Sequence, residues 1–214
     1  MNKHSKLVIS ITKFLVPIIL GFAVIIFVGL LMNDELRLRF WPLVTAYFFP
    51  PLGKETVIPA GVGSGVPPMT MALSIAFVDI IVALFLVWNY DLAKKIPLVG
   101  RFITKIEDIG KSSSDKYNWI KPLRFIGIIL FVMVPFQGSG GLVGSILGRL
   151  FGMKPWNTFI AISIGAIVGC TLIAYFTNAI LSIFETSFLQ GLIVLIVVLI
   201  FGIMIFIYRK NKKK

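Results

Sequence analysis

Charged and metal-binding side chains are scarce in this chain of 214 residues. Only 14% of the residues are charged and 57% are hydrophobic, whereas soluble domains carry about a quarter charged residues. There is one histidine, His4, and one cysteine, Cys170. These two residues exclude a disulfide framework and the usual Cys and His metal sites, and the HExxH, Walker and GxSxG motifs are absent. We therefore predict no catalytic residues, no bound metal and no cofactor.

Long apolar runs divide the chain instead. About 20 apolar residues cross a bilayer, and four runs approach or exceed that length. The expected spanning helices cover residues 14–32, 67–88, 157–184 and 188–208. Pro17 falls in the first turn of the first run, where a missing N–H costs little. The sequence thus predicts an all-α membrane protein with a single integral membrane domain over residues 1–214.

Two further apolar segments, residues 41–65 and 125–152, are interrupted by turn-forming residues. The first contains Pro50-Pro51-Leu52-Gly53, and the second contains Pro135-Phe136-Gln137-Gly138-Ser139-Gly140-Gly141. Pro and Gly interrupt helices, and in lipid the freed backbone groups must be shielded by protein or by a water-filled cavity. We predict that each segment enters the bilayer and turns back as a re-entrant hairpin. Broken segments at matching places in two halves point to a transporter's binding site.

The distribution of basic residues favours this topology. The formal net charge is +12, and the basic residues flank apolar runs, as topology determinants do. If both segments turn back, all Lys and Arg except Arg37, Arg39 and Lys54 lie on the cytoplasmic side. The N-terminus, the basic loop 89–124 with a short amphipathic helix, and the basic C-terminal tail 209–214 are then cytoplasmic. The two hairpins enter from opposite faces, which is an inverted repeat.

The same charge pattern bears on location and partners. Basic residues beside spanning helices attract anionic lipid head groups, so membrane lipids are the expected partners and the cell membrane is the expected location. Because the basic residues are explained by membrane topology, no nucleic-acid partner is expected. A homo-oligomer is compatible with the sequence.

Two acidic residues fall inside apolar segments. Glu55 follows the first Pro/Gly turn, and Asp79 lies well within the span 67–88. A charged residue near the bilayer centre costs about 2.5 to 3.5 kcal/mol on insertion scales and usually faces a cavity or a partner. We predict that Glu55 carries the coupling proton or ion, with Asp79 as the second candidate. The alternatives are an ion pair of Glu55 with Lys54 or Arg149, a solvated Glu55, and a purely structural polar contact for Asp79.

The predicted substrate-binding groups gather at the two turns. Consecutive N–H groups at a turn or a helix N-terminus can hold an anion. A guanidinium such as that of Arg149 binds phosphate bidentately, although this side chain could instead reach the inner membrane interface. The predicted substrate-binding residues are Lys54, Pro59, Pro135, Gln137, Gly138, Ser139, Gly140 and Arg149.

Regularly spaced glycines predict close helix packing. One set falls four residues apart at positions 140, 144, 148 and 152, and a second consists of Gly165 and Gly169. Each set leaves one helix face without side chains, which allows another helix to approach closely.

The two turns resemble motifs of a known family. Gly53-Lys54-Glu55-Thr56-Val57-Ile58-Pro59-Ala60-Gly61, followed by Gly65-Val66-Pro67-Pro68, resembles the first motif of the small multidrug export proteins. The stretch 130–140, followed by Gly144, resembles the second, where the family usually reads Pro-Leu-Pro-Gly-Thr-Gly and Gln137 replaces the second Pro. The similarity covers roughly residues 45–180. The family is also similar to the DedA and VTT-domain proteins, which share a Glu-x-x-x-Pro re-entrant motif and functional Arg residues in a second re-entrant segment.

The resemblance implies a transporter-like fold with two opposed hairpins. For the DedA relatives it implies movement of anionic lipid head groups, such as a polyprenyl phosphate or a phospholipid, coupled to the proton gradient. We therefore expect a small secondary transporter or lipid flippase that moves such a head group or a small amphipathic solute. Two alternatives are a non-transporting scaffold for anionic lipids or partner proteins, and a membrane enzyme acting on lipid-linked phosphates. A scaffold does not need Glu55 at membrane depth, and the scarcity of His, Cys and acidic clusters disfavours the enzyme.

Overall fold

The structure is a computed structural model that describes residues 3–49, 52–94, 120–135 and 139–186. Side chains are described in these ranges except at 3–7, 91–94, 120–122 and 183–186. All regular structure in the described ranges is helical. The expected last span at 188–208, the tail at 209–214 and most of the basic loop 89–124 lie outside the described residues.

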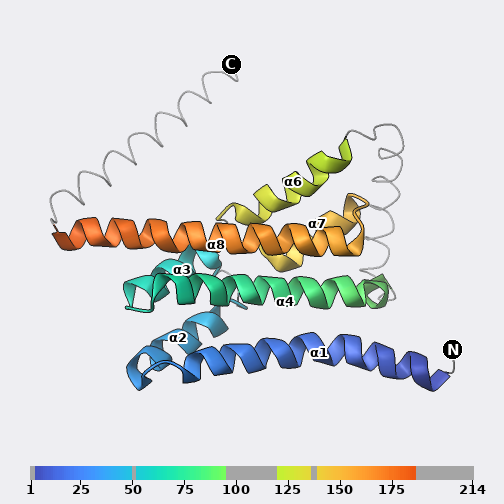
Figure 1. The fold of residues 1–214 in the computed structure, drawn as a ribbon, viewed down its shortest axis with the longest axis horizontal. Helices are drawn as coiled ribbons and strands as arrows, with labels where there is room; N and C mark the ends of the chain where they lie inside the picture. Colours follow the sequence, from blue (N-terminus) through green and yellow to red (C-terminus); the bar gives the residue numbers. More distant parts are fainter. Residues whose placement is uncertain (1–2, 50–51, 95–119, 136–138, 187–214) are drawn as a thin grey trace, which may run out of the picture.

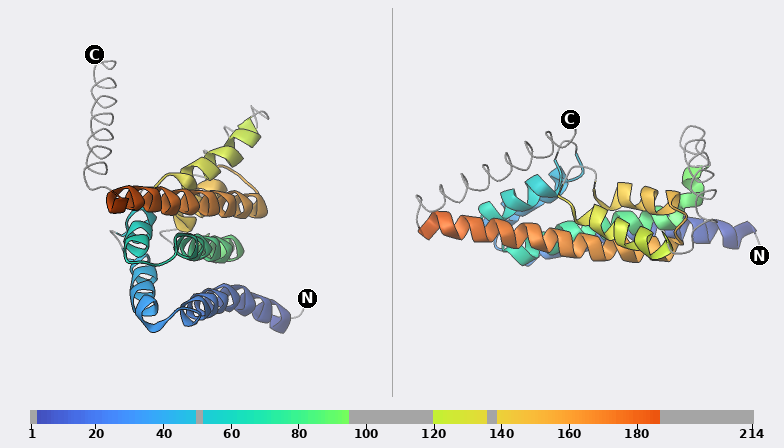
Figure 2. Two further views of the ribbon diagram at one scale, coloured as in Figure 1. Left: turned by 60° about the vertical axis from the view of Figure 1, so that its left-hand side comes forward. Right: turned by 90° about the horizontal axis from the view of Figure 1, so that it is seen from above.

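Three long helices form a frame in the described part of the chain. They are α1 (Lys3–Leu30), α4 (Pro68–Lys94) and α8 (Pro155–Thr186). Helix α4 packs against both of the others, and it runs in the opposite direction to them (Figure 1). Figure 2 shows α4 between α1 and α8 from another side. Each helix contains a stretch long and apolar enough to cross a bilayer, so the chain is an α-helical membrane protein.

Four shorter helices form two pairs beside this frame. The first pair is α2 (Asp34–Ala46) and α3 (Lys54–Gly63), and the second is α6 (Ile120–Met133) and α7 (Gly141–Leu150). The first pair lies toward the end of the frame where α1 ends, and the second lies toward the opposite end (Figure 1). In each pair the turn between the helices contains the Pro and Gly residues that interrupt the apolar segment.

Local capping explains why α2 begins earlier than the broken segment expected at 41–65. The side chain of Asn33 accepts a backbone N–H of the first turn at 2.9 Å, and Asp34 and Glu35 occupy that turn. Acidic residues there are favoured by the helix dipole. Arg37 donates to two backbone carbonyls at the end of α1, at 3.1 and 3.0 Å. The polar stretch after α1 is therefore a helix start and a cap.

Pro17 lies well inside α1, so the expectation that it occupies the first turn is wrong. Proline has no N–H to donate to the carbonyl four residues before it, which here belongs to Lys13. The Asn89 side chain of α4 donates to that Lys13 carbonyl at 2.9 Å. A side chain from the neighbouring helix thus replaces the missing bond and joins α1 to α4.

The predicted close packing is confirmed for every glycine of the two sets except Gly152. A Cβ built on Gly144 or Gly148 would collide with side chains of α6 or α8. A Cβ on Gly165 or Gly169 would lie 2.7 or 2.8 Å from backbone atoms of α6. Gly152 has a different role. It lies just after the end of α7 with a φ of +71°, a backbone conformation that favours glycine. These glycines let α6, α7 and α8 approach one another at backbone distance.

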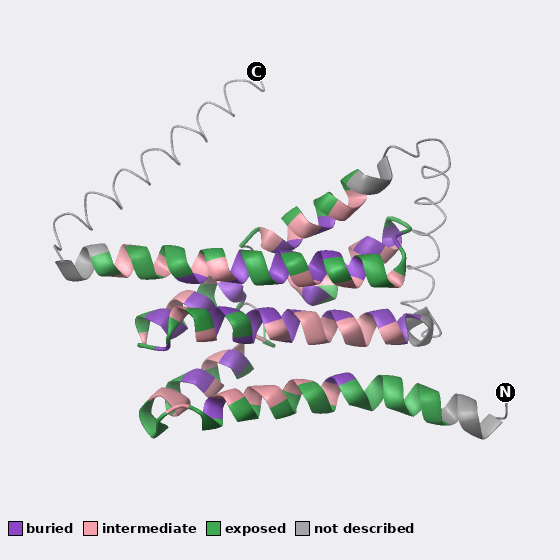
Figure 3. Ribbon diagram, in the orientation of Figure 1, coloured by how far each residue is buried: buried purple, intermediate pink, exposed green. Residues whose placement is uncertain are grey.

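Burial centres on α4 and α8 rather than on α1. Within the most apolar stretch of each helix, 50% of residues are buried in α4, 39% in α8 and 6% in α1 (Figure 3). Apolar side chains along α1 are therefore exposed, as expected where a helix faces lipid. Any internal site must be built around α4 and α8 and the two short pairs.

Candidate functional site

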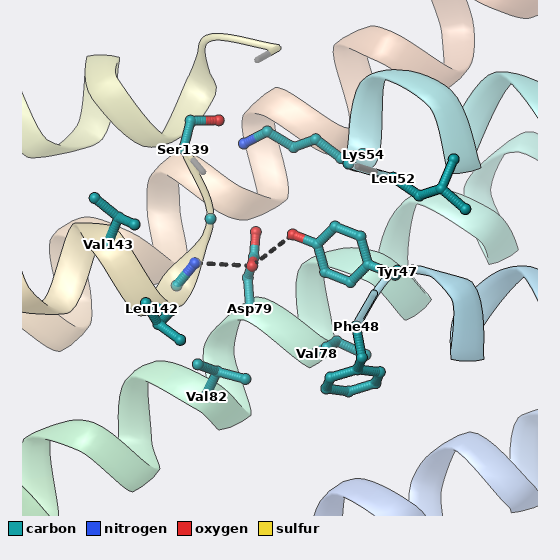
Figure 4. A pocket seen from close by; sticks show the side chains of 13 residues that line it. Tyr47, Phe48, Leu52, Lys54, Val78, Asp79, Val82, Ser139, Leu142 and Val143 are labelled. Atoms are coloured by element: carbon teal, nitrogen blue, oxygen red, sulfur yellow. Dashed lines mark hydrogen bonds between the residues drawn. The ribbon is translucent and has the colours of Figure 1, made fainter. Parts of the chain in front are cut away.

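Asp79 lies in the middle of α4 and is only 3% exposed. Its Oδ1 atom accepts two hydrogen bonds, one from the Tyr47 hydroxyl and one from the Gly141 backbone N–H, each at 2.8 Å (Figure 4). Tyr47 directly follows α2, and Gly141 begins α7. One carboxylate oxygen therefore joins the turns of both helix pairs to the central helix.

The second carboxylate oxygen of Asp79 is buried without a partner. Its Oδ2 atom has no hydrogen-bond partner among the described residues. Buried polar atoms are rarely left unpaired, because each costs about 1 to 3 kcal/mol, and more when the group is charged. An unpaired oxygen at this position is therefore a candidate for binding a proton or a ligand.

A cavity of about 470 Å³ lies beside Asp79 (Figure 4). This volume falls in the range of small-molecule sites. The cavity is bounded by α4 and by the turns of both helix pairs, and most of its walls are apolar. The lining residues are Tyr47, Phe48, Leu52, Gly53, Lys54, Val78, Asp79, Val82, Ser139, Gly140, Gly141, Leu142 and Val143.

Lys54 contributes a buried positive charge to the same cavity. It is the first residue of α3 and is 1% exposed. Its ammonium group donates to the backbone carbonyl of Val132, near the end of α6, where the helix dipole carries partial negative charge. The charge also acts on the Asp79 carboxylate, but no ion pair within 4.0 Å joins Lys54 to a described carboxylate.

The predicted coupling residue Glu55 lies next to this cavity without lining it. Its carboxyl group folds back over Gly53, because a Cβ built on that glycine would touch both carboxyl oxygens. This places an acidic group at the N-terminus of α3, where the helix dipole favours it. No ion pair of Glu55 with Lys54 or Arg149 is found among the described side chains. Its Oε2 atom is buried and unpaired, and its role stays a prediction.

Arg149 lies near the opposite end of α7 from the cavity. Its guanidinium carbon is 4.5 Å from the centroid of the Tyr90 ring, and its Nη1 donates to the Met153 carbonyl at 3.0 Å. It therefore stacks on Tyr90 of α4 and bonds to the link between α7 and α8.

The remaining predicted residues divide between the cavity and other places. Three members of the predicted substrate-binding set line the cavity, namely Lys54, Ser139 and Gly140. Pro59 and Pro135 are not among the lining residues. Gln137 and Gly138 lie outside the described residues. The Ser139 side chain is buried, and its hydroxyl donates to the Val134 carbonyl at 2.6 Å.

Tyr47 is a site residue that the sequence analysis did not identify. The sequence does contain an indication of its role, because its hydroxyl is the only polar side-chain group in the stretch Ala46-Tyr47-Phe48-Phe49. A tyrosine hydroxyl in an apolar segment usually finds a hydrogen-bond partner. The identity of that partner depends on how α2 meets α4, and the sequence does not show this.

The chain matches the model of a known protein family. The model of the family described as "Putative small multi-drug export protein" matches residues 55–172, more than half of the chain. The chain belongs to this family. The family prediction made from the two turn motifs is thus confirmed, and the matched range includes α4, α6, α7 and most of α3 but not α1 or α2. The search of curated proteins and the search of solved structures give no match, so the relation to DedA proteins stays a prediction.

Proposed function

We propose that this family member is a small secondary transporter whose substrate site is the cavity between the two turns. In this proposal Asp79 carries the coupling proton or ion. The supporting observation is the arrangement of its carboxylate, with Oδ1 bonded to both turns and Oδ2 unpaired in the buried cavity. A scaffold that only holds lipids or partners does not need such a group at the centre of a spanning helix.

The two helix pairs are proposed to be re-entrant hairpins that enter from opposite faces as an inverted repeat. Their helices have 13 and 10 residues, and 14 and 10 residues. At 1.5 Å per residue these are about 15 to 20 Å long, which is too short for a bilayer core of about 30 Å. Their positions toward opposite ends of the frame support this topology (Figure 1). The positive-inside rule then puts the N-terminus and the C-terminal tail in the cytoplasm.

Protonation of Asp79 provides a mechanism for coupling. An ionised carboxylate accepts hydrogen bonds about twice as strong as those of a neutral group, so ionised Asp79 holds both turns on α4. Protonation weakens its bonds to Tyr47 and Gly141 and releases the turns. One hairpin then moves against the other, and the cavity opens to the opposite face of the membrane.

The cargo proposed here is a small amphipathic solute. Ligand sites of this kind combine mainly apolar walls with a few polar groups, and the cavity has that character. A polyprenyl phosphate or phospholipid head group is the other cargo expected from the sequence. That choice depends on the resemblance to the DedA proteins, and the buried Asp79 carboxylate in the cavity wall disfavours a purely anionic group there.

Access to the cavity from each face in turn tests the proposal without knowledge of the substrate. Val143 lines the cavity, and replacing the single cysteine by Cys170→Ala leaves Val143→Cys as the only thiol. A membrane-impermeant thiol reagent should label Val143→Cys both in intact cells and in inside-out vesicles, because a transport site must open to both sides.

A lipid-facing valine provides the matched control. Val168 lies on the exposed face of α8, so Val168→Cys should react poorly from either side. Labelling of Val143→Cys from one face only, or no labelling at all, would contradict a transport site.

A further inference from the structure

Two opposite charges, those of Lys54 and Asp79, border the cavity without forming an ion pair within 4.0 Å. The Oδ2 atom of Asp79 has no partner among the described residues. An ammonium group has three N–H donors, and Lys54 directs one of them to the Val132 carbonyl. Figure 4 shows the Lys54 amine and the Asp79 carboxylate directed into the same region. Each charged group therefore retains capacity for a further partner.

Separated buried charges require compensation. Removing a charge from water is unfavourable unless a partner with good geometry restores the lost interactions. A ligand with one charge would satisfy either Asp79 or Lys54 and leave the other group unmatched. A ligand that carries a positive and a negative group can match both charges.

The N-terminus of α7 adds to the positive side of the cavity. The first bond of its helical ladder runs from the Gly144 N–H to the Gly140 carbonyl at 3.0 Å. The N–H groups of Leu142 and Val143 therefore precede the ladder, and both residues line the cavity. Free N–H groups at a helix start favour an anionic group. The first N–H of α7, that of Gly141, already binds Asp79 Oδ1, so the N–H groups of Leu142 and Val143 are the ones left for a ligand. At the N-terminus of α3 the Glu55 carboxyl group lies over Gly53.

The remaining wall of the cavity is apolar. It consists of Phe48 and Leu52 from the first turn, Val78 and Val82 from α4, and Val143 from α7. Burying apolar ligand surface against such side chains is favourable in proportion to the area removed from water. A ligand with an aliphatic body therefore fits this wall better than a fully polar one.

We propose that the cavity binds a small zwitterion with an aliphatic body, of the kind that an aliphatic amino acid represents. Its protonated amine binds Asp79 Oδ2, and its carboxylate binds the Lys54 ammonium and the N–H groups at the start of α7. The aliphatic body lies against the apolar wall. This inference rests on the proposed function, since it names the substrate class of the same site.

Titration calorimetry on the purified full-length protein in detergent tests the inference. The probes are L-leucine, isocaproate, which lacks the amine, and isoamylamine, which lacks the carboxylate. L-leucine should bind, and each singly charged analogue should bind at least about tenfold more weakly, because a site built around paired polar groups rejects a ligand that leaves one unpaired. Equal or tighter binding of either analogue would overturn the proposal, as would the absence of binding by L-leucine.

Two substitutions assign the two ends of the ligand. Lys54→Gln should remove the preference for L-leucine over isoamylamine, and Asp79→Asn should remove the preference for L-leucine over isocaproate. The matched controls are Lys154→Gln and Asp34→Asn, because both residues are exposed and lie outside the cavity. If both cavity variants kept the wild-type preferences, the proposal would be wrong. If either variant fails to fold by circular dichroism, the analogue series on the wild-type protein still decides the question.

The binding test of the zwitterion and the labelling test of transport can give different results, so each proposal can fail without the other. Labelling of Val143→Cys from both faces, together with no binding of L-leucine, would contradict the zwitterion and leave the transporter in place. Selective binding of L-leucine, together with labelling from one face only, would support the zwitterion site and contradict transport.

Discussion

At the scale of single residues, the site depends on contacts between positions that are far apart in the sequence. Asp79 and Glu55 are the two acids in apolar segments, and the sequence alone favours Glu55 as the coupling residue. The structure places Asp79 in the cavity wall and Glu55 at the start of α3. The contacts of Asp79 could not be derived from the sequence, because they depend on Tyr47 and Gly141 reaching one carboxylate oxygen. Both residues belong to turns whose approach to α4 is a tertiary property.

The close approach of Gly141 to α4 gives a prediction about stability. A Cβ on Gly141 would overlap the backbone carbonyl of Asp79, whereas a Cβ on Gly127 would meet nothing within 4 Å. Gly141→Ala should destabilise the protein by about 1 to 3 kcal/mol through overpacking. Gly127→Ala, in the exposed part of α6, should be neutral or stabilise by up to about 1 kcal/mol. Thermal unfolding in detergent compares the two, and equal midpoints would show that the close contact between α7 and α4 is absent.

At the scale of helices, the interruptions were easier to predict than the helix ends. The Pro/Gly turns predicted two broken segments, and helices end at Ala46 and Met133 and resume at Lys54 and Gly141. These breaks are local properties of proline and glycine. The start of α2 was not predicted, because the polar stretch after the first span resembles a loop until Asn33 is recognised as a cap. Helix ends are set by single capping contacts, which are weak signals in a sequence.

The hairpin topology gives a prediction at this scale. Single cysteines in the Cys170→Ala background at the start of α2 (Asp34→Cys) and at the end of α3 (Gly63→Cys) should both be labelled from outside. A cysteine just after α7 (Lys154→Cys) should be labelled only from inside. All three positions are exposed. Opposite-sided labelling of Asp34→Cys and Gly63→Cys would mean that the first pair crosses the membrane, and the inverted repeat would then be lost.

At the scale of the whole molecule, one carboxylate connects the two halves. The peripheral helix α1 is mostly exposed and lies outside the family match, whereas α4, α6, α7 and most of α3 lie within it. We propose that the protonation state of Asp79 controls the position of one hairpin relative to the other. This claim follows from a single oxygen that accepts hydrogen bonds from both turns.

The most direct test measures the distance between the two helix pairs at different pH. Spin labels on Leu38→Cys in α2 and Leu123→Cys in α6, both exposed positions, report this distance by double electron–electron resonance in nanodiscs, again with Cys170→Ala. The distance distribution should shift between acidic and alkaline buffer, stay fixed in Asp79→Asn, and still shift in Glu55→Gln. A shift that persists unchanged in Asp79→Asn would contradict the account, and a shift lost only in Glu55→Gln would move the coupling role to Glu55.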